Sequence, residues 1–189
     1  GFFGTTAFGL SEGSNWDFTF LLFQTMFAAT AVTICSGAMA ERTRYTAYLL
    51  SAAAIVTFIY PVFGSWAWGG SYGGQGWLAE LGFIDFAGST VVHSLGAWCA
   101  LAGVIAVGAR TGRFDNSGNT RNIPGHNLSL VALGGFILWF GWFGFNGGSA
   151  LSASENIGGI ILNTHLSAAA GAGGAILLSA LLQRPILLT

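Results

Sequence analysis

Charge is what this sequence has least of. Its 189 residues include no lysine, six arginines and seven acidic residues, so only 7% of the chain is charged while 53% is hydrophobic. Soluble domains usually carry about 25% charged residues, and so few charges could not cover the surface of a soluble protein of this length. The mean hydropathy of +0.65 agrees. The composition therefore excludes an ordinary soluble domain and predicts an integral membrane protein.

Cysteine is also scarce, with only Cys35 and Cys99. Both fall inside apolar runs, which favours two small buried side chains over a disulfide or a metal pair. Cysteine and histidine do not cluster with metal-ligand spacing, and the sequence has no phosphate-binding loop with a Gly-Lys-Ser/Thr end. The net charge of −1 gives no sign of a nucleic-acid partner. We expect no metal, no cofactor and no enzymatic reaction.

Glycine and long apolar runs are abundant instead. The 30 glycines are typical of transmembrane helices that pack closely against each other. Most of the apolar runs are about twenty residues or longer, the length needed to cross a bilayer as a helix. A β-barrel would require alternating segments of about ten residues, which favours helices here. We therefore predict an all-α integral membrane protein, a single domain over residues 1–189, with spans at 18–40, 45–63, 84–108, 127–146 and 156–182.

Every basic residue follows the first, third or fifth predicted span. By the positive-inside rule, the loops that carry these arginines are cytoplasmic and residues 1–17 lie outside. This orientation puts Asp85 and Ser149 at the outer face. The arginines are Arg42, Arg44, Arg110, Arg113, Arg121 and Arg184.

Two ionisable residues open the third run. On a continuous helix, His93 would lie about 12 Å deeper than Asp85 and about 80° around the helix axis from it. An ionisable side chain at the depth of His93 is costly in a bilayer and by default marks a substrate pathway. The alternatives are that Asp85 is only a helix cap and that His93 only packs against a neighbouring helix.

Aromatic and hydroxyl side chains gather at the same outer face. Trp68 precedes the third span, while Phe145 and Ser149 end the fourth. Aromatic rings attract a small monovalent cation and a hydroxyl can accept its hydrogen bond, while an imidazole such as His93 can hydrogen-bond without carrying charge. Trp66 is a rival to Trp68, and the phenylalanines could equally face lipid.

Three motifs then carry a resemblance. They are Asp85-Phe-Ala-Gly-Ser-Thr-Val-Val-His93, Gly37-Ala-Met-Ala-Glu41-Arg42 and Trp142-Phe-Gly-Phe-Asn-Gly-Gly-Ser149. Their order and spacing resemble the ammonium transporter family (Amt/MEP/Rh). The stretch from Thr90 to Trp98 and the loop from Gly108 to Phe114 resemble its bacterial and archaeal branch in particular. The resemblance implies a fold of eleven helices in two inverted halves, of which this chain covers roughly the third to the seventh. We therefore expect a fragment that lacks the first two helices and the second of the family's two pore histidines.

The resemblance also implies roles for individual residues. Phe27 and Phe145 would be the stacked rings that gate the pore, and Trp68 and Ser149 would hold the recruited ammonium. Asp85 would support recruitment from beneath the surface, and His93 would be the first pore histidine. The implied setting is the cell membrane, as a homotrimer that binds ammonium or ammonia, with methylammonium as an analogue. A cytoplasmic regulatory protein is a further partner that the resemblance allows.

Two other functions remain open at this point. The same fold could bind ammonium as a sensor, with an attached cytoplasmic signalling domain. The chain could instead be a structural or regulatory membrane subunit with a degenerate pore, although all six site positions hold the expected residue types. The role of His165, inside the fifth run, is not assigned.

Overall fold

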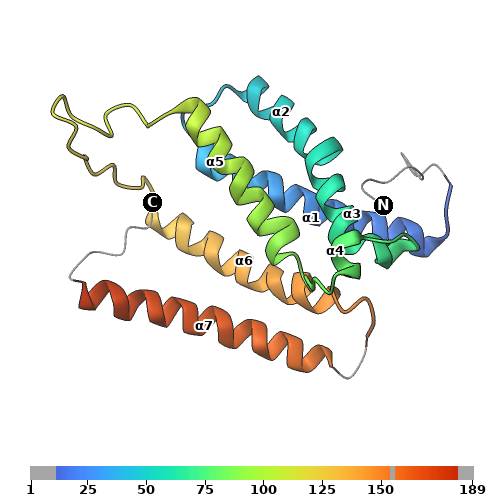
Figure 1. Cartoon of the computed structure of the whole chain (residues 1–189). Coiled ribbons are helices and arrows are strands. Elements are labelled where there is room, and N and C mark those ends of the chain that lie inside the picture. Colours follow the sequence, from blue (N-terminus) through green and yellow to red (C-terminus); the bar gives the residue numbers. More distant parts are fainter. Residues whose placement is uncertain (1–11, 154–155, 183–189) are drawn as a thin grey trace. The chain divides into compact units, whose positions relative to one another are not determined.

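The computed structural model describes residues 12–153 and 156–182 (Figure 1). Within these residues five helical spans are long and apolar enough to cross a membrane, which confirms the predicted all-α architecture: Asn15–Met39, Tyr45–Ser71, Ser89–Val107, Leu128–Gly148 and Ile157–Leu181. Contacts divide the chain into two compact units, Gly1–Thr111 and Gly112–Thr189. Each unit is described by itself.

Helix α1, Asn15–Met39, begins three residues before the predicted span because a capping box extends it. The backbone N–H of Asp17 donates to Ser14 Oγ over 3.3 Å, and the backbone N–H of Ser14 donates to Asp17 Oδ2 over 2.7 Å. This reciprocal pair satisfies donors that a helix start leaves open. One stripe of α1 is buried, and it consists of Phe27, Ala31, Val32, Cys35 and Met39.

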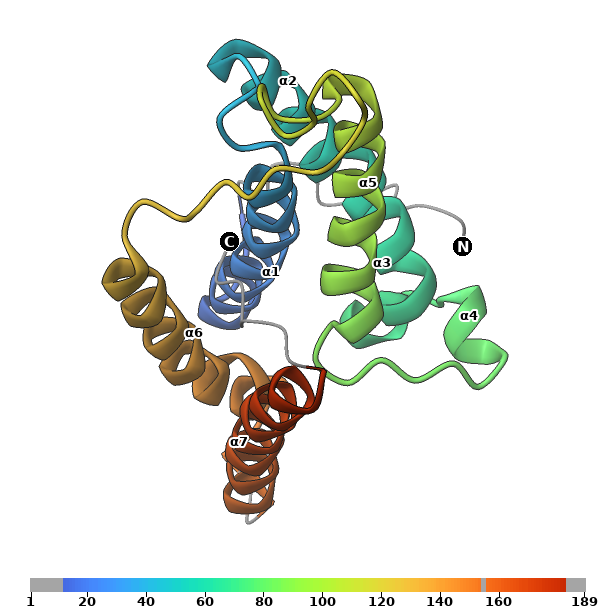
Figure 2. The ribbon, with the colours of Figure 1, turned by 90° about the vertical axis from the view of Figure 1, so that its left-hand side faces the viewer.

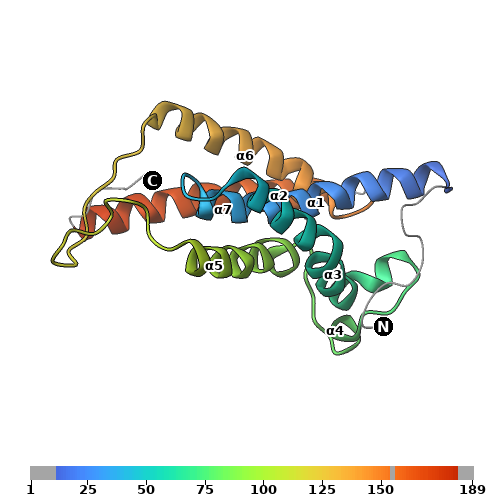
Figure 3. The same cartoon turned by 90° about the horizontal axis from the view of Figure 1, so that it is seen from above.

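The second span is a continuous but irregular rod (Figure 3). It comprises α2 (Tyr45–Ala54), the π-helical turn η1 (Ile55–Ile59), α3 (Tyr60–Trp68) and the 3₁₀ turn η2 (Gly69–Tyr72). Pro61 is the second residue of α3, two positions after the end of the π-helical turn, and a proline cannot donate to the preceding turn of a regular helix. The rod continues past the predicted end at residue 63 and so brings Trp68 to the last turn of α3.

The third span begins later than predicted. After the short helix α4 (Trp77–Glu80), a non-helical segment leads to the π-helical turn η3 (Ser89–Ser94) and to α5 (Leu95–Val107). Gly88 has a φ of +92°, in the left-handed region, and precedes the first helical residue. Asp85 therefore lies before the helix, and the angle of about 80° between Asp85 and His93 on one regular helix does not describe the molecule.

Helices α1 and α5 pack closely side by side in the first unit (Figure 2). A Cβ added at Gly96 would lie 2.9 Å from the main-chain oxygen of Ala31, and one added at Gly103 would overlap the Met39 side chain. Cys35 Sγ donates to the carbonyl of Gly96 over 3.2 Å. Small residues therefore let the two backbones approach, as they do in other membrane helices.

The ends of these two helices are also linked by an ion pair. Arg110 Nε lies 3.0 Å from Glu41 Oε2, and Glu41 has a φ of +69° just after α1. Arg42, the neighbour of Glu41, instead donates from Nη2 to the carbonyl of Ala38 over 2.7 Å. Because Glu41 is largely exposed, such a pair contributes at most about 1 kcal/mol.

The second unit is built around α6 (Leu128–Gly148) and α7 (Ile157–Leu181). Asn127 caps α6 by accepting from the backbone N–H of Leu130 over 2.9 Å. Ahead of α6, Asp115 organises an exposed turn, in which the backbone N–H groups of Asn119 and Ser117 donate to its carboxylate. These hydrogen bonds, that of Asn119 first, hold the pKa of Asp115 below its usual range.

Candidate functional site

Asp85 is buried, with 7% of its surface exposed. Its carboxylate accepts hydrogen bonds from the backbone of residues 88–91. Oδ1 accepts from the backbone N–H groups of Gly88 and Ser89 at 2.8 and 3.0 Å. Oδ2 accepts from those of Thr90 and Val91 at 2.9 and 2.8 Å. These are the donors that a helix start leaves without helical partners. Asp85 therefore caps η3 and places negative charge at the N-terminal end of a helix, where it is favoured.

Trp68 joins Asp85 to α1. Its indole Nε1 donates to the main-chain oxygen of Asp85 over 2.6 Å. The same ring meets Phe27 edge to face, with centroids 5.9 Å apart and planes at 78°. Phe27 is only 2% exposed and also packs on Phe23, at 4.5 Å between centroids. Three sequence-predicted residues from separate segments thus form one cluster.

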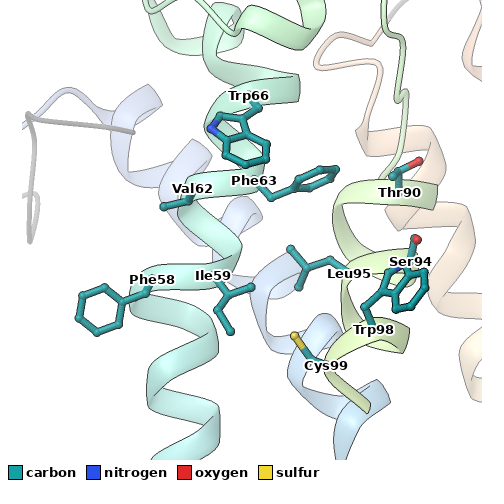
Figure 4. A pocket seen from close by; sticks show the side chains of 10 residues that line it. All are labelled: Phe58, Ile59, Val62, Phe63, Trp66, Thr90, Ser94, Leu95, Trp98 and Cys99. Atoms are coloured by element: carbon teal, nitrogen blue, oxygen red, sulfur yellow. The ribbon is translucent and has the colours of Figure 1, made fainter. Parts of the chain in front are cut away.

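Trp66, the rival of Trp68, points elsewhere. Its ring packs against Phe63 and Trp77, at centroid distances of 5.7 and 5.6 Å. It also lines an apolar groove of about 620 Å³ between the second span and the η3–α5 segment. Figure 4 shows Trp66 and Phe63 on one wall of this groove and Leu95 and Trp98 on the other. Trp68 does not line this groove. The two tryptophans therefore have different neighbours: Trp66 faces the groove, and Trp68 contacts Asp85 and Phe27.

Gly88 is a member of the cluster that sequence reasoning missed. Its φ of +92° favours glycine, and a Cβ at this position would lie 2.5 Å from Val92 Cγ2 and 3.2 Å from Trp68 Cη2. Its backbone N–H is held by Asp85. The available signal was a glycine inside the motif between Asp85 and the first helical residue.

His93 is half-buried in η3 and turns back toward Gly88. Its Nδ1 lies 3.1 Å from the Gly88 carbonyl oxygen, and its backbone N–H donates to the same oxygen over 3.0 Å. This bond reaches back five residues, which defines a π-helical turn. Such turns occur frequently at functional sites. A chain of contacts therefore runs from Trp68 through Asp85 and Gly88 to His93.

Phe145 and Ser149 lie in the second unit, at the end of α6. Ser149 Oγ donates to the carbonyl of Phe145 over 2.8 Å, and both side chains are half-buried. Asn146, the residue after Phe145, donates from Nδ2 to Thr164 Oγ1 of α7 over 3.0 Å. The two predicted residues are thus neighbours on α6, and their substrate role remains a prediction.

His165, on α7, has aromatic neighbours on α6. Its ring centroid lies 5.3 Å from that of Trp139 and 6.3 Å from that of Phe143. The sequence offered no partner for this histidine, because a contact between two apolar runs leaves no motif. Across residues 12–153 and 156–182, no group of three or more His, Cys, Asp or Glu side chains could hold a metal ion.

The relationship of this chain to known proteins agrees with the geometry. A model of the Ammonium Transporter Family matches residues 1–188. The chain belongs to the ammonium transporter family. As a member of this family with five apolar helical spans, it is a multi-pass membrane protein.

Individual family members are closely similar to the chain. It is 48% identical to the ammonium transporter Amt2 of Archaeoglobus fulgidus over 91% of this chain and 38% of that protein. It is 45% identical to ammonium transporter 1 member 3 of Oryza sativa subsp. japonica over 84% of this chain and 33% of that protein. A solved structure named Sensor Amt Protein matches with a TM-score of 0.82 and 52% identity, over 85% of this chain and 40% of that one.

These figures carry two consequences. The chain spans about two fifths or less of the length of these relatives. The relatives named as ammonium transporters place the chain with transport proteins and not with enzymes.

Proposed function

We propose that the protein to which this chain belongs moves ammonium across the cell membrane. Family membership supports the substrate, and the cluster of Phe27, Trp68 and Asp85 supports the mechanism. The observation that carries the proposal is the double engagement of Trp68, whose N–H donates to Asp85 while its ring meets Phe27. An aromatic entrance is thereby coupled to a buried acid.

Recruitment is the first step. The ring face of Trp68 attracts ammonium through cation–π contact, worth about 0.5–2 kcal/mol depending on desolvation, and the buried ring of Phe27 supports Trp68 edge to face. The family resemblance assigns two further roles to the second unit, in which Phe145 would supply another ring and Ser149 a hydrogen-bond acceptor. Asp85 adds attraction through its field alone, because its two carboxylate oxygens already accept four backbone N–H groups.

Passage is the second step. An ammonium ion in the hydrocarbon slab is costly, whereas neutral ammonia is not. Ammonium therefore gives up its proton to water on the outer side of the ring gate, and ammonia continues past His93. The imidazole offers hydrogen bonding there without a fixed charge.

The two tryptophans provide the test. In the full-length protein, Trp68→Phe keeps a ring but removes the N–H that donates to Asp85, a bond worth about 1 kcal/mol. We expect the half-saturation concentration for methylammonium uptake to rise about fivefold, the factor that corresponds to this energy. Trp66→Phe, in the apolar groove, is the matched control and should transport normally. Equal effects of the two substitutions, or none from Trp68→Phe, would contradict the proposal.

Ammonium sensing is the second candidate, because a solved relative at 52% identity is named a sensor. A sensor would bind ammonium at the same cluster and report it through an attached cytoplasmic domain. Vesicles that contain the full-length protein separate the two functions. Methylammonium flux supports transport, binding without flux together with a signalling domain supports sensing, and neither binding nor flux indicates a degenerate pore.

The assembly follows from the same family relationship. We propose that the two units form one transmembrane domain within a homotrimer in the cell membrane, and that a cytoplasmic regulatory protein is a further partner. The arginine-bearing loops face the cytoplasm and residues 1–17 face outward, a proposal supported by the six arginines that all follow odd-numbered spans.

A further inference from the structure

Two cysteines lie at the same level of the contact between α1 and α5. A Cβ added at Gly96 of α5 would lie 2.9 Å from the main-chain oxygen of Ala31 of α1. Cys35 follows Ala31 by one helical turn, and the two helices run in the same direction. Cys99 lies nearly one turn beyond Gly96. The side chains of Cys35 and Cys99 interact with each other, and both thiols are free.

One of these sulfur atoms is fixed in the core, and the other is reached from outside it. Cys35 is 1% exposed, and its Sγ donates to the main-chain oxygens of Ala31 and Gly96 over 3.4 and 3.2 Å. Cys99 is half-buried and lines the apolar groove of about 620 Å³ between the second span and the η3–α5 segment. Figure 4 shows its sulfur on the groove side of α5. A small ligand that enters the groove therefore meets Cys99 first, with Cys35 next to it.

We propose that Cys35 and Cys99 form a two-sulfur binding site for a thiophilic divalent cation such as Hg²⁺. Binding breaks both S–H bonds, forms two metal–sulfur bonds and releases two protons to water. Thiols are weak donors, so little hydrogen bonding is lost when Cys35 gives up its proton. The ion and the two thiolates together carry no net charge, which matters because an uncompensated charge in apolar surroundings is costly. The site is independent of the proposed function.

The surroundings of the cysteine pair select against cations that need more ligands. Structural Zn²⁺ is almost always held by four ligands, and Mg²⁺ and Ca²⁺ require oxygen ligands. Within residues 12–153 and 156–182, no third His, Cys, Asp or Glu forms a metal-binding group with the pair. The groove is lined by apolar and aromatic side chains and by the hydroxyls of Thr90 and Ser94. A cation that is satisfied by two sulfur atoms therefore fits this site, and Zn²⁺ does not.

The experiment measures the affinity and the number of sulfur ligands. The full-length protein, with cysteines outside residues 1–189 replaced by alanine, is titrated with Hg²⁺ against a competing monothiol. After removal of the monothiol, X-ray absorption counts the sulfur atoms bound to the ion. We expect one ion per chain with two sulfur ligands. Because the second sulfur binds within the same molecule, Cys35→Ser and Cys99→Ser should each weaken binding by about 100-fold or more. Ser94→Ala, on the same groove, is the matched control and should bind Hg²⁺ normally, and Zn²⁺ should not compete.

Either of two results would overturn the proposal: an affinity for Hg²⁺ that Cys35→Ser leaves unchanged, or one sulfur ligand per bound ion in the unmodified protein. If Cys35→Ser does not fold, Cys99→Ser, at the groove wall, and the sulfur count in the unmodified protein still decide the point. Both measurements are made without transport, so a negative result leaves the proposed function unaffected. Absence of methylammonium flux in a protein that has the two-sulfur site would contradict the proposed function alone.

Discussion

At the scale of single residues, Asp85 is a buried acid whose negative charge is compensated by its own backbone. Four N–H groups and the Ser89 hydroxyl donate to it, and its carbonyl holds Trp68. An aspartate in such a position has two separable effects. Its oxygen atoms accept hydrogen bonds that cap the start of the helix, and its negative charge contributes to the local electrostatic field.

Substitution at Asp85 separates these effects. Asp85→Ala leaves four N–H groups, two of them buried, without their acceptors, so we expect it to lower the free energy of unfolding by about 2–4 kcal/mol. Asp85→Asn keeps one acceptor oxygen and removes the charge, so it should cost about half as much. Thermal unfolding of the detergent-solubilised full-length protein, followed by tryptophan fluorescence, measures both.

The control for this series is Glu80→Ala, which removes an exposed acid from α4 and should change stability by less than about 0.5 kcal/mol. Equal unfolding temperatures for Asp85→Ala and Asp85→Asn would show that capping is unimportant and would leave only the electrostatic effect.

Residue types and motif order predicted Asp85, Trp68 and His93 as a group, but not how they are joined. Hydropathy cannot distinguish Trp66 from Trp68, since the choice depends on the helix continuing past residue 63. The structural role of Gly88 could not be predicted for a similar reason. It depends on a positive φ and on the direction of its carbonyl group, and neither can be recognised from composition or periodicity.

At the scale of helices, the contact between α1 and α5 depends on glycines with different neighbours. A Cβ at Gly96 would meet the rigid main chain at Ala31 and the Ile34 side chain, whereas one at Gly103 would meet the Met39 thioether. Methionine is flexible and can move aside, while a main-chain oxygen cannot. The two glycines therefore tolerate substitution unequally.

This difference gives an element-scale prediction. Gly96→Ala should lower the free energy of unfolding by about 1–3 kcal/mol through overpacking. Gly103→Ala should be nearly neutral, because the gain in helix propensity of about 1 kcal/mol offsets the displacement of Met39. Gly37→Ala, on α1 with nothing within 4 Å of its added Cβ, reports the propensity gain by itself. If Gly103→Ala proved as destabilising as Gly96→Ala in thermal unfolding, the contact would not be governed by main-chain approach.

Helix limits show where sequence patterns fail for physical reasons. Apolar runs located all five spans because hydrocarbon thickness sets their length. The ends differ where local hydrogen bonding decides: Ser14 extends α1 and Asp85 delays the third helix. The π-helical turns η1 and η3 could not be foreseen, because a turn with one extra residue has the same composition as a regular one.

At the scale of the whole molecule, the orientation in the membrane rests on arginine placement and is open to direct test. With Cys35 and Cys99 replaced by alanine, Ser117→Cys should react with a membrane-impermeant thiol reagent only from the cytoplasmic side. Leu81→Cys, at a position 77% exposed, should react only from outside. Labelling of intact cells compared with inverted vesicles measures both, and the reverse pattern would show that the proposed orientation is wrong.

The direction of the Asp85 carboxylate also bears on how long a cation stays. A carboxylate in direct contact with ammonium would hold it through full opposite charge, and a pathway must release what it binds. Here both oxygens face the helix start. Under the proposed function, a cation at the entrance would therefore meet aromatic rings and not the carboxylate itself, and we expect it to be held weakly and released quickly.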